Sequence, residues 1–267
     1  MKTLNTQLFW SILTCVIFFS TTLLEAQKRV IISAMGQDVQ YRISRAEVHA
    51  PSAETHRNID TGEDIINHLK GDPIDFWVFF SHGNDSRLFG KNPRKRTTNY
   101  SSGLTLTSLA EKADFYPKSR TLADLEKAIK DGSIKFAEDA LIYLGACAVA
   151  ASNPITNEIF AQELANVTGA TIIAGEHQTE PQTENYQELI YTNIHHFMEF
   201  RPNQTPKLLG PRFHLTKMME VYRKTGKLHH EFESEHLKER VNRTPSATSP
   251  TLNTPQSNEV EENKERN

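Results

Sequence analysis

Short apolar runs alternate with amphipathic segments through the middle of the chain. Runs rich in β-branched and aromatic residues predict four strands, at residues 29–34, 75–81, 140–145 and 170–174. Helical periodicity, capping threonines and glycine stops predict three intervening helices, at residues 61–70, 121–130 and 154–167. This alternation predicts an α/β fold, in which a mostly parallel sheet is covered by helices on both faces.

The remaining central stretches carry other patterns. The polar and basic residues 84–104 predict a long loop, and residues 184–200 are spaced as in a helix. The runs 218–223 and 227–232 are separated by Lys224, Thr225 and Gly226, so we expect them to form a hairpin that closes one edge of the sheet.

The two ends of the chain depart from this pattern. In residues 1–26, a charge-free run follows Lys2 and ends before Ala26, which is the layout of a secretory signal peptide. The run is also just long enough to cross a bilayer, so a retained N-terminal anchor is the alternative. Residues 242–267 are rich in Pro, Ser, Thr and Asn, and predict a disordered tail. We therefore expect an exported protein, periplasmic or secreted, with one α/β domain at residues 27–241.

Composition narrows the class of protein further. The chain is 37% hydrophobic and 24% charged, which excludes a wholly disordered chain and a membrane protein with many spans. A formal net charge of −3 gives no strong field of either sign, so we expect neither a nucleic acid nor, in the mature form, a membrane as partner. Of the two cysteines, Cys15 lies in the expected signal peptide. Cys147 would then be the only thiol of the mature chain, either reactive or buried and inert.

Two of the predicted buried strands are followed by residues with reactive side chains. His82 and Gly83 come directly after the run 75–81, and Cys147 follows the run 140–145. Ligands of open parallel sheets bind at the carboxyl ends of strands, so neighbouring strands would place His82 and Cys147 at one edge. A histidine that takes the proton of a thiol is the minimal arrangement for nucleophilic catalysis by cysteine. The backbone amide of Gly83 is the expected donor to an oxyanion.

Four further residues flank these strand ends and could contact a substrate. Ser81 and Asp85 lie on either side of the His-Gly pair, and Glu176 and His177 follow the run 170–174. The adjacent pairs His195-His196 and His229-His230 do not point the same way on a helix or strand, so no metal site is expected from them.

The blocks VFFSHG at 78–83 and LIYLGAC at 141–147 resemble those of the caspase-like cysteine peptidase superfamily, above all its bacterial branches of the CHAT, clostripain and gingipain type. The resemblance covers roughly residues 28–235, of which only these two blocks are specific. The Gln-Ala-Cys-Arg-Gly of caspases and the Asp-Ala-Cys of clostripain-like enzymes are both absent, because Gly145 precedes Ala146 and Cys147. The resemblance therefore implies neither aspartate specificity nor a pocket for basic residues.

What the resemblance implies is a thiol endopeptidase acting on peptide or protein substrates, and the expected signal peptide would make it an exported one. Cys147 would be the nucleophile, His82 the general base and later acid, and a thioester acyl-enzyme the intermediate; this chemistry requires no metal or cofactor. The alternative is a catalytically inactive binding or effector module with the same fold, since a fold alone does not establish activity. A third reading is a cysteine hydrolase that acts on a non-peptide amide or ester.

Overall fold

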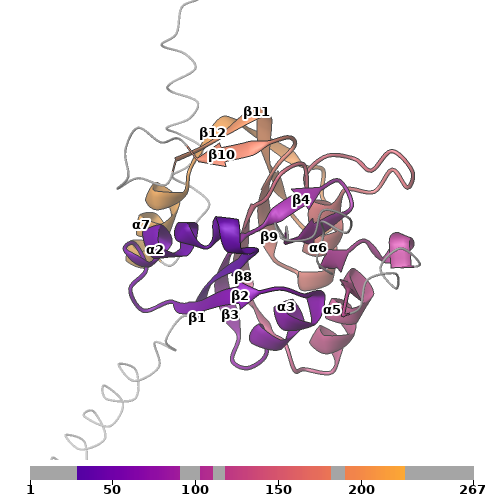
Figure 1. Cartoon of the computed structure of the whole chain (residues 1–267), viewed down its shortest axis with the longest axis horizontal. Coiled ribbons are helices and arrows are strands. Elements are labelled where there is room, and N and C mark those ends of the chain that lie inside the picture. The colour runs from indigo at the N-terminus through magenta and orange to yellow at the C-terminus, as the bar shows by residue number, and fades with distance from the viewer. Residues whose placement is uncertain (1–28, 91–102, 111–117, 182–189, 226–267) are drawn as a thin grey trace, which may run out of the picture.

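The computed structural model describes residues 29–90, 103–110, 118–181 and 190–225 (Figure 1). The predicted signal peptide at 1–26 and the predicted tail at 242–267 lie outside these residues. The described residues form a mixed α/β structure around a large, mostly parallel sheet, as the alternation of strands and helices predicts.

Five parallel strands make up the centre of the sheet, in the order β2-β1-β3-β8-β9. Their bounds are Arg29–Met35 for β1, Glu54–Ile59 for β2, Ile74–Phe80 for β3, Phe136–Gly145 for β8 and Thr171–Gly175 for β9. The sheet continues beyond β9 with antiparallel pairing through β11, which β10 and β12 flank. These last three strands span Thr179–Pro181 for β10, Ile190–Phe200 for β11 and Lys207–His214 for β12.

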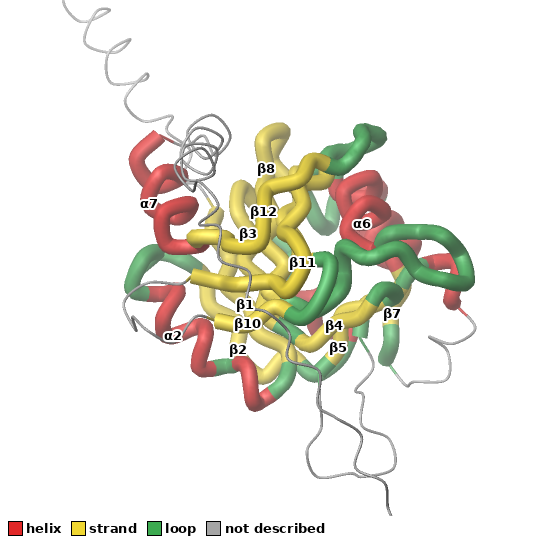
Figure 2. The backbone as a smooth tube through the Cα atoms, turned by 90° about the horizontal axis from the view of Figure 1, so that it is seen from above, coloured by secondary structure: helices red, strands yellow, loops and turns green. Residues whose placement is uncertain are grey.

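Helices cover both faces of the sheet, as expected for parallel strands. Helices α2 (Tyr41–Glu47) and α7 (Leu215–Thr225) pack on one face, against Phe76, Val78 and Phe80 among others. The opposite face is covered by α3 (Gly62–His68), α5 (Leu122–Lys130) and α6 (Phe160–Thr168). Figure 2 shows α2 and α7 on one side of the strands and α6 on the other. Two short 3-10 turns, η1 (Gln37–Val39) and η2 (Thr107–Leu109), complete the described helical elements.

The predicted helix signals act as expected at three termini. Thr61 and Thr121 each form a capping box, in which the threonine side chain accepts from the N–H of Asp64 or Asp124 and the aspartate accepts from the threonine N–H. Gly169 ends α6 in the left-handed conformation, with φ of 74°. Local sequence therefore fixes where these helices begin or end.

The predicted loop at 84–104 is wrong in its described part. Strands of a small second sheet occupy much of it. The order of this sheet is β4-β5-β6-β7, with β4 at His82–Asn84, β5 at Arg87–Phe89, β6 at Leu104–Thr105 and β7, beyond the predicted loop, at Arg120–Thr121. The side chain of Asn84 accepts from the N–H groups of Ser86 and Arg87 and so makes the turn between β4 and β5. Strands of two or three residues are too short to show a period of two, so the pattern does not reveal them.

Two further predictions for the last third of the domain are wrong. Residues 190–200, within the predicted helix 184–200, form strand β11, and 184–189 lie outside the described residues. Residues 218–223 belong to helix α7, where Met218, Met219 and Tyr222 are buried at helical spacing. The other predicted hairpin arm, 227–232, lies outside the described residues. The edge of the sheet carries an antiparallel hairpin, but β11 and β12 form it.

Three elements beside the parallel strands also differ from the prediction: helix α6 begins later than expected, and helix α2 and strand β2 were not predicted. The predicted helix 154–167 begins only at Phe160, because the Asn153 side chain accepts from the N–H groups of Ile155 and Thr156 and holds a turn there. Helix α2 and edge strand β2 were not expected; β2 buries only Ile59 fully, so it lacks an apolar run.

Among the described residues, no helix is long and apolar enough to cross a membrane.

Candidate active site

The register between β3 and β8 aligns His82 with Cys147. Phe80 is the register partner of Gly145 in this parallel pair, and His82 and Cys147 each lie two residues further along. Both residues therefore leave the sheet at its carboxyl edge, from adjacent strands. This is the juxtaposition that the two apolar runs predict.

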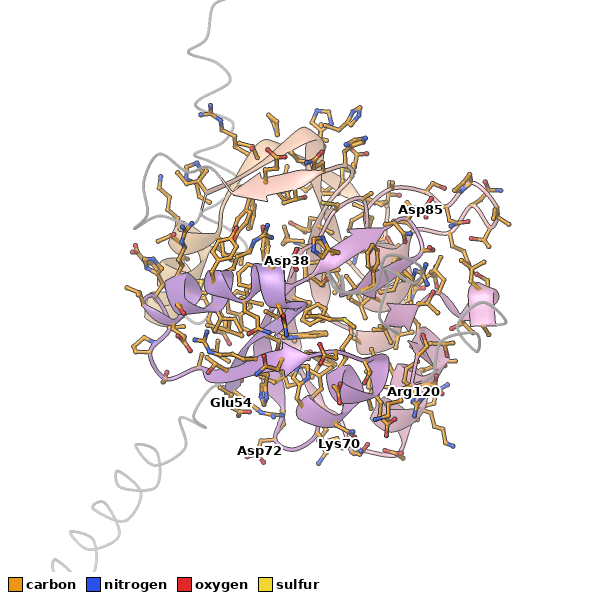
Figure 3. The ribbon with its side chains drawn as sticks, viewed as in Figure 1. Asp38, Glu54, Lys70, Asp72, Asp85 and Arg120 are labelled. Atoms are coloured by element: carbon orange, nitrogen blue, oxygen red, sulfur yellow. The ribbon has the colours of Figure 1, made fainter. Side chains whose placement is uncertain are left out.

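His82 is held by two neighbours. Its Nε2 lies 2.7 Å from Oδ2 of Asp38, and its ring stacks on Phe89 with the centroids 6.1 Å apart. Asp38 belongs to η1, which directly follows β1, and Figure 3 shows it beside the start of β4. Sequence reasoning missed Asp38, although its position after a predicted strand was the same signal that pointed to His82. Three neighbouring strands, β1, β3 and β8, thus each deliver one polar residue to the same edge.

A cavity of about 450 Å³ opens at this edge of the sheet. Four of the residues singled out in the sequence line it: Ser81, His82, Cys147 and His177. The other lining residues are Val39, Arg42, Gly145, Ala148, Gln178, Thr179 and Glu180. The cavity therefore joins the ends of β1, β3, β8 and β9 at the place where a parallel sheet binds its ligands.

The segment that carries Cys147 is tied to β9 and to the segment after it. Ala148 adopts φ of 57°, a left-handed conformation that is uncommon for a residue with a side chain. Its N–H donates to the carbonyl of His177 at 3.0 Å, and the N–H of Ala150 donates to Gly175 at 3.1 Å. The thiol of Cys147 is free and half-buried. A turn held this way fixes the direction in which the thiol leaves the strand.

Gly83 lies against the same segment and needs to be small. A Cβ at this position would lie 2.7 Å from Cγ1 of Val149 and 2.9 Å from the carbonyl oxygen of Cys147. The absence of a side chain thus allows the His82 and Cys147 segments to approach each other. Gly83 does not line the cavity, and its expected role as an oxyanion donor stays a prediction.

Asp85 and Glu176, the other two predicted substrate contacts, bond to residues outside the cavity. Asp85 accepts from Nδ2 of Asn153 at 3.3 Å, which links the segment after β4 to the one after Cys147; Figure 3 shows Asp85 near the far end of β4. The carboxylate of Glu176 lies 3.2 Å from Nδ1 of His196 on β11. Neither residue lines the cavity. Of the four predicted substrate contacts, the structure therefore brings only Ser81 and His177 to it.

Arg42 is the second cavity residue that sequence reasoning missed. Its Nη1 donates to the carbonyl of Gly145 at 3.3 Å, and its guanidinium lies 5.8 Å from the ring centroid of Tyr191. Burial acts to lower the pKa of Arg42, but the neighbouring Tyr191 and Tyr41 outweigh it and the net pKa is raised, so the group stays charged. Sequence reasoning missed this arginine because it did not predict helix α2, which carries Arg42 to the cavity.

The described residues hold no group of three or more His, Cys, Asp and Glu side chains placed to bind a metal ion. No protein-family model and no curated protein matches this chain. The proposed function is therefore based on the cavity and the side chains that line it.

Proposed function

We propose that the chain is an exported, caspase-like cysteine endopeptidase. The observation that carries the proposal is the register of β3 and β8, which puts His82 and Cys147 at one cavity. The hydrogen bond between His82 and Asp38 supports it, because a base that is itself oriented by a third group is typical of activated nucleophiles.

The first step is proton transfer from the thiol to His82. An ionised Asp38 only accepts, so Nε2 of neutral His82 carries the proton in their hydrogen bond and Nδ1 is left unprotonated. Nδ1 is therefore the nitrogen that takes the proton of Cys147. The thiolate formed in this way is the nucleophile.

The second step is attack of the thiolate sulfur on the scissile carbonyl carbon. The C–S bond forms as the carbonyl π electrons move to oxygen, and the Gly83 amide is the donor assigned to that oxyanion. His82 then returns its proton to the leaving amine as the C–N bond breaks, which leaves a thioester on Cys147. Water, deprotonated by His82, hydrolyses the thioester and restores the thiol.

An electrophilic peptide tests this proposal directly. A peptidyl acyloxymethyl ketone should alkylate Cys147, the site being read by mass spectrometry, and a panel of different sequences should label at rates that depend on the peptide. The His82→Ala variant should label far more slowly than the wild type, with its melting temperature nearly unchanged. Labelling that ignores both the peptide sequence and His82 would instead favour the catalytically inactive binding module.

Export is the second part of the proposal, and it rests on the charge-free run that follows Lys2. We expect the mature chain to begin near Gln27. Sequencing of the N-terminus of secreted or periplasmic material checks this, and an intact Met1 on membrane-bound material would favour the anchor.

A further inference from the structure

Asn193 on β11 is a buried residue, 5% exposed, whose side-chain amide bonds to three other residues. Its Nδ2 donates to the carbonyl of His177 at 2.9 Å and to Oγ1 of Thr179 at 3.1 Å. Its Oδ1 accepts from the N–H of His195 at 2.9 Å. The opposite orientation of the amide is excluded, because Oδ1 would then face the carbonyl oxygen of His177 and both are acceptors. Asn193 therefore ties β11 to the segment that follows β9.

The backbone around Asn193 is shaped to hold this side chain. Between Thr192 and Phe197, β11 advances five residues while its partner β12 advances two, so Asn193 lies at the start of a bulge. On the other side of β11, Asn193 is the register partner of Thr179 in β10. A Cβ at Gly175 would lie 2.5 Å from Oγ1 of Thr179 and closer still to Nδ2 of Asn193. The amide therefore fits only because Gly175 has no side chain.

The two peptide groups that flank Cys147 are held by the segment after β9. The N–H of Ala148 donates to the carbonyl of His177 at 3.0 Å, which fixes the peptide group after the cysteine. Oγ1 of Thr179 donates to the carbonyl of Ala146 at 3.3 Å, which fixes the group before it, and also lies 3.4 Å from the His177 carbonyl. Each peptide group is planar, so fixing both sets the φ and ψ angles of Cys147. The direction in which the thiol leaves the backbone is set with them.

We propose that Asn193 is a positioning residue for the candidate nucleophile, and that it aims Cys147 through His177 and Thr179. Both of the bonds that flank Cys147 run to groups that the Asn193 amide holds. Asn193 does not line the cavity, so it acts on the thiol only through the backbone. The left-handed conformation of Ala148 persists only where its surroundings hold it, and these bonds supply that hold. The proposal rests on the proposed function in taking Cys147 as the reacting residue.

Amide hydrogen exchange of Asn193→Leu tests the tie without any reaction at the thiol. Leucine has a similar size but no donor, so the His177 carbonyl loses one of its two partners. The N–H of Ala148, which shares that carbonyl, should exchange about fivefold faster, as expected for the loss of one supporting hydrogen bond. The N–H of Ala150 bonds to Gly175 instead, so its exchange should stay near the wild-type rate. Unchanged exchange at Ala148 would overturn the proposal.

The peptidyl acyloxymethyl ketone separates binding from reaction at Cys147. Because Asn193 lies outside the cavity, Asn193→Leu should bind the reagent nearly as well as the wild type does. The rate constant for alkylation within the complex should fall by about a hundredfold, the cost of displacing a reacting atom by about 1 Å. A loss confined to binding, or shared equally between binding and reaction, would mark Asn193 as a general support of the fold and overturn the proposal.

Thr179→Val tests the same turn from its other contact, including the case in which Asn193→Leu does not fold. It removes the hydroxyl between Asn193 and Ala146 with little change of shape and should slow alkylation, whereas Thr179→Ser keeps the hydroxyl and should recover much of the rate. Thr168→Val is the matched control, because Thr168 is also buried but bonds to Leu164 outside the cavity. It should lower the melting temperature without slowing alkylation. If it slows alkylation as much as Thr179→Val, the effect is one of stability and the positioning role is excluded.

The two kinds of measurement distinguish a failure of this proposal from a failure of the proposed function. Peptide-dependent labelling of the wild type, with the same alkylation rate in Asn193→Leu, would uphold the peptidase and refute the positioning role. Faster exchange at Ala148 in Asn193→Leu, in a chain whose labelling ignores both the peptide sequence and His82, would uphold the hold of Asn193 on the turn of Cys147 and refute the peptidase.

Discussion

Oδ2 of Asp38 lies 2.7 Å from Nε2 of His82, although 44 residues separate the two in sequence. They meet because β1 and β3 are adjacent parallel strands, so that the segments after both strands leave the same edge of the sheet. The pair gives the candidate base an oriented ring, and it is the feature of the site that the motif alone does not contain.

Replacing Asp38 with Asn should lower the rate of peptide hydrolysis without unfolding the protein. An asparagine side chain can present its N–H₂ group to Nε2, which would favour the tautomer with the proton on Nδ1 and block proton transfer from Cys147. We expect kcat/KM to fall by about a hundredfold, the lower end of the range that general-base catalysis supplies. Asp85→Asn is the control, since Asp85 bonds to Asn153 outside the cavity, and it should stay near the wild-type rate. Equal rates for Asp38→Asn and the wild type would remove Asp38 from the mechanism.

Gly83→Ala should impair the site by forcing two segments apart. The added Cβ would lie 2.7 Å from Val149 Cγ1 and 2.9 Å from the carbonyl of Cys147, so one segment has to move. We expect a loss of about 1–3 kcal/mol in stability, typical of overpacking, together with slower labelling of Cys147. Gly132→Ala is the comparison, because a Cβ there meets nothing within 4 Å and only its φ of 79° is strained. Unchanged labelling of Gly83→Ala would show that the segments tolerate separation.

The strands and site residues that the sequence predicts correctly are those that belong to, or directly follow, a long apolar run. Strands β3, β8 and β9 are buried on both faces, so their sequences mark them directly, and with them the positions of His82 and Cys147. Asp38 and Arg42 lie on η1 and α2, short elements whose few buried positions leave no period to detect. The spacing of apolar residues over 184–200 predicts a helix, but 190–200 form strand β11, because the spacing of apolar residues alone does not separate a helix from a strand with buried and exposed stretches. The alternation of elements thus predicted the sheet, and pairing between distant segments completed the site.

His68 should make the stability of the protein depend on pH. Its Nδ1 lies 2.9 Å from the carbonyl of Asp64 and must carry the proton, so Nε2 accepts from the Ser33 hydroxyl at 2.9 Å. The Ser33 oxygen accepts in turn from Nε1 of Trp77 at 3.2 Å. Burial lowers the pKa of His68 from 6.5 to about 4, because the charged ring would lose its hydration in the protein interior. A second proton, on Nε2, would also break the hydrogen bond from Ser33.

The direction of the effect follows from which state binds the proton. Between pH 6.5 and about 4 the unfolded chain protonates His68 and the folded chain does not, so stability falls as the pH falls. The loss of stability is at most about 3 kcal/mol. Above pH 6.5 and well below pH 4, the titration of His68 causes no further change in stability with pH. Urea unfolding of wild type and His68→Gln across this range measures it. The stability difference between them should shrink toward low pH; parallel curves would show that His68 does not titrate in this way.

The two capping boxes should each contribute measurably to stability. Thr61 and Thr121 accept from the N–H of Asp64 at 3.1 Å and of Asp124 at 3.3 Å. Thr61→Ala and Thr121→Ala should each cost about 1 kcal/mol, and the serine variants, which keep the hydroxyl, should cost less. Thermal or urea unfolding checks this. An alanine variant no less stable than its serine counterpart would show that the hydroxyl is not needed at that helix.

The central claim is that His82 and Cys147 act as one catalytic unit. The most direct measurement is peptide hydrolysis by wild type, Cys147→Ala, His82→Ala and the double variant, each checked for an unchanged melting temperature. Loss of either partner in a comparable nucleophile–base system costs on the order of 10⁶ in turnover, and losing both adds little. We predict the same non-additive pattern here. Wild-type activity in Cys147→Ala, or losses from the two single variants that simply multiply in the double variant, would contradict the account.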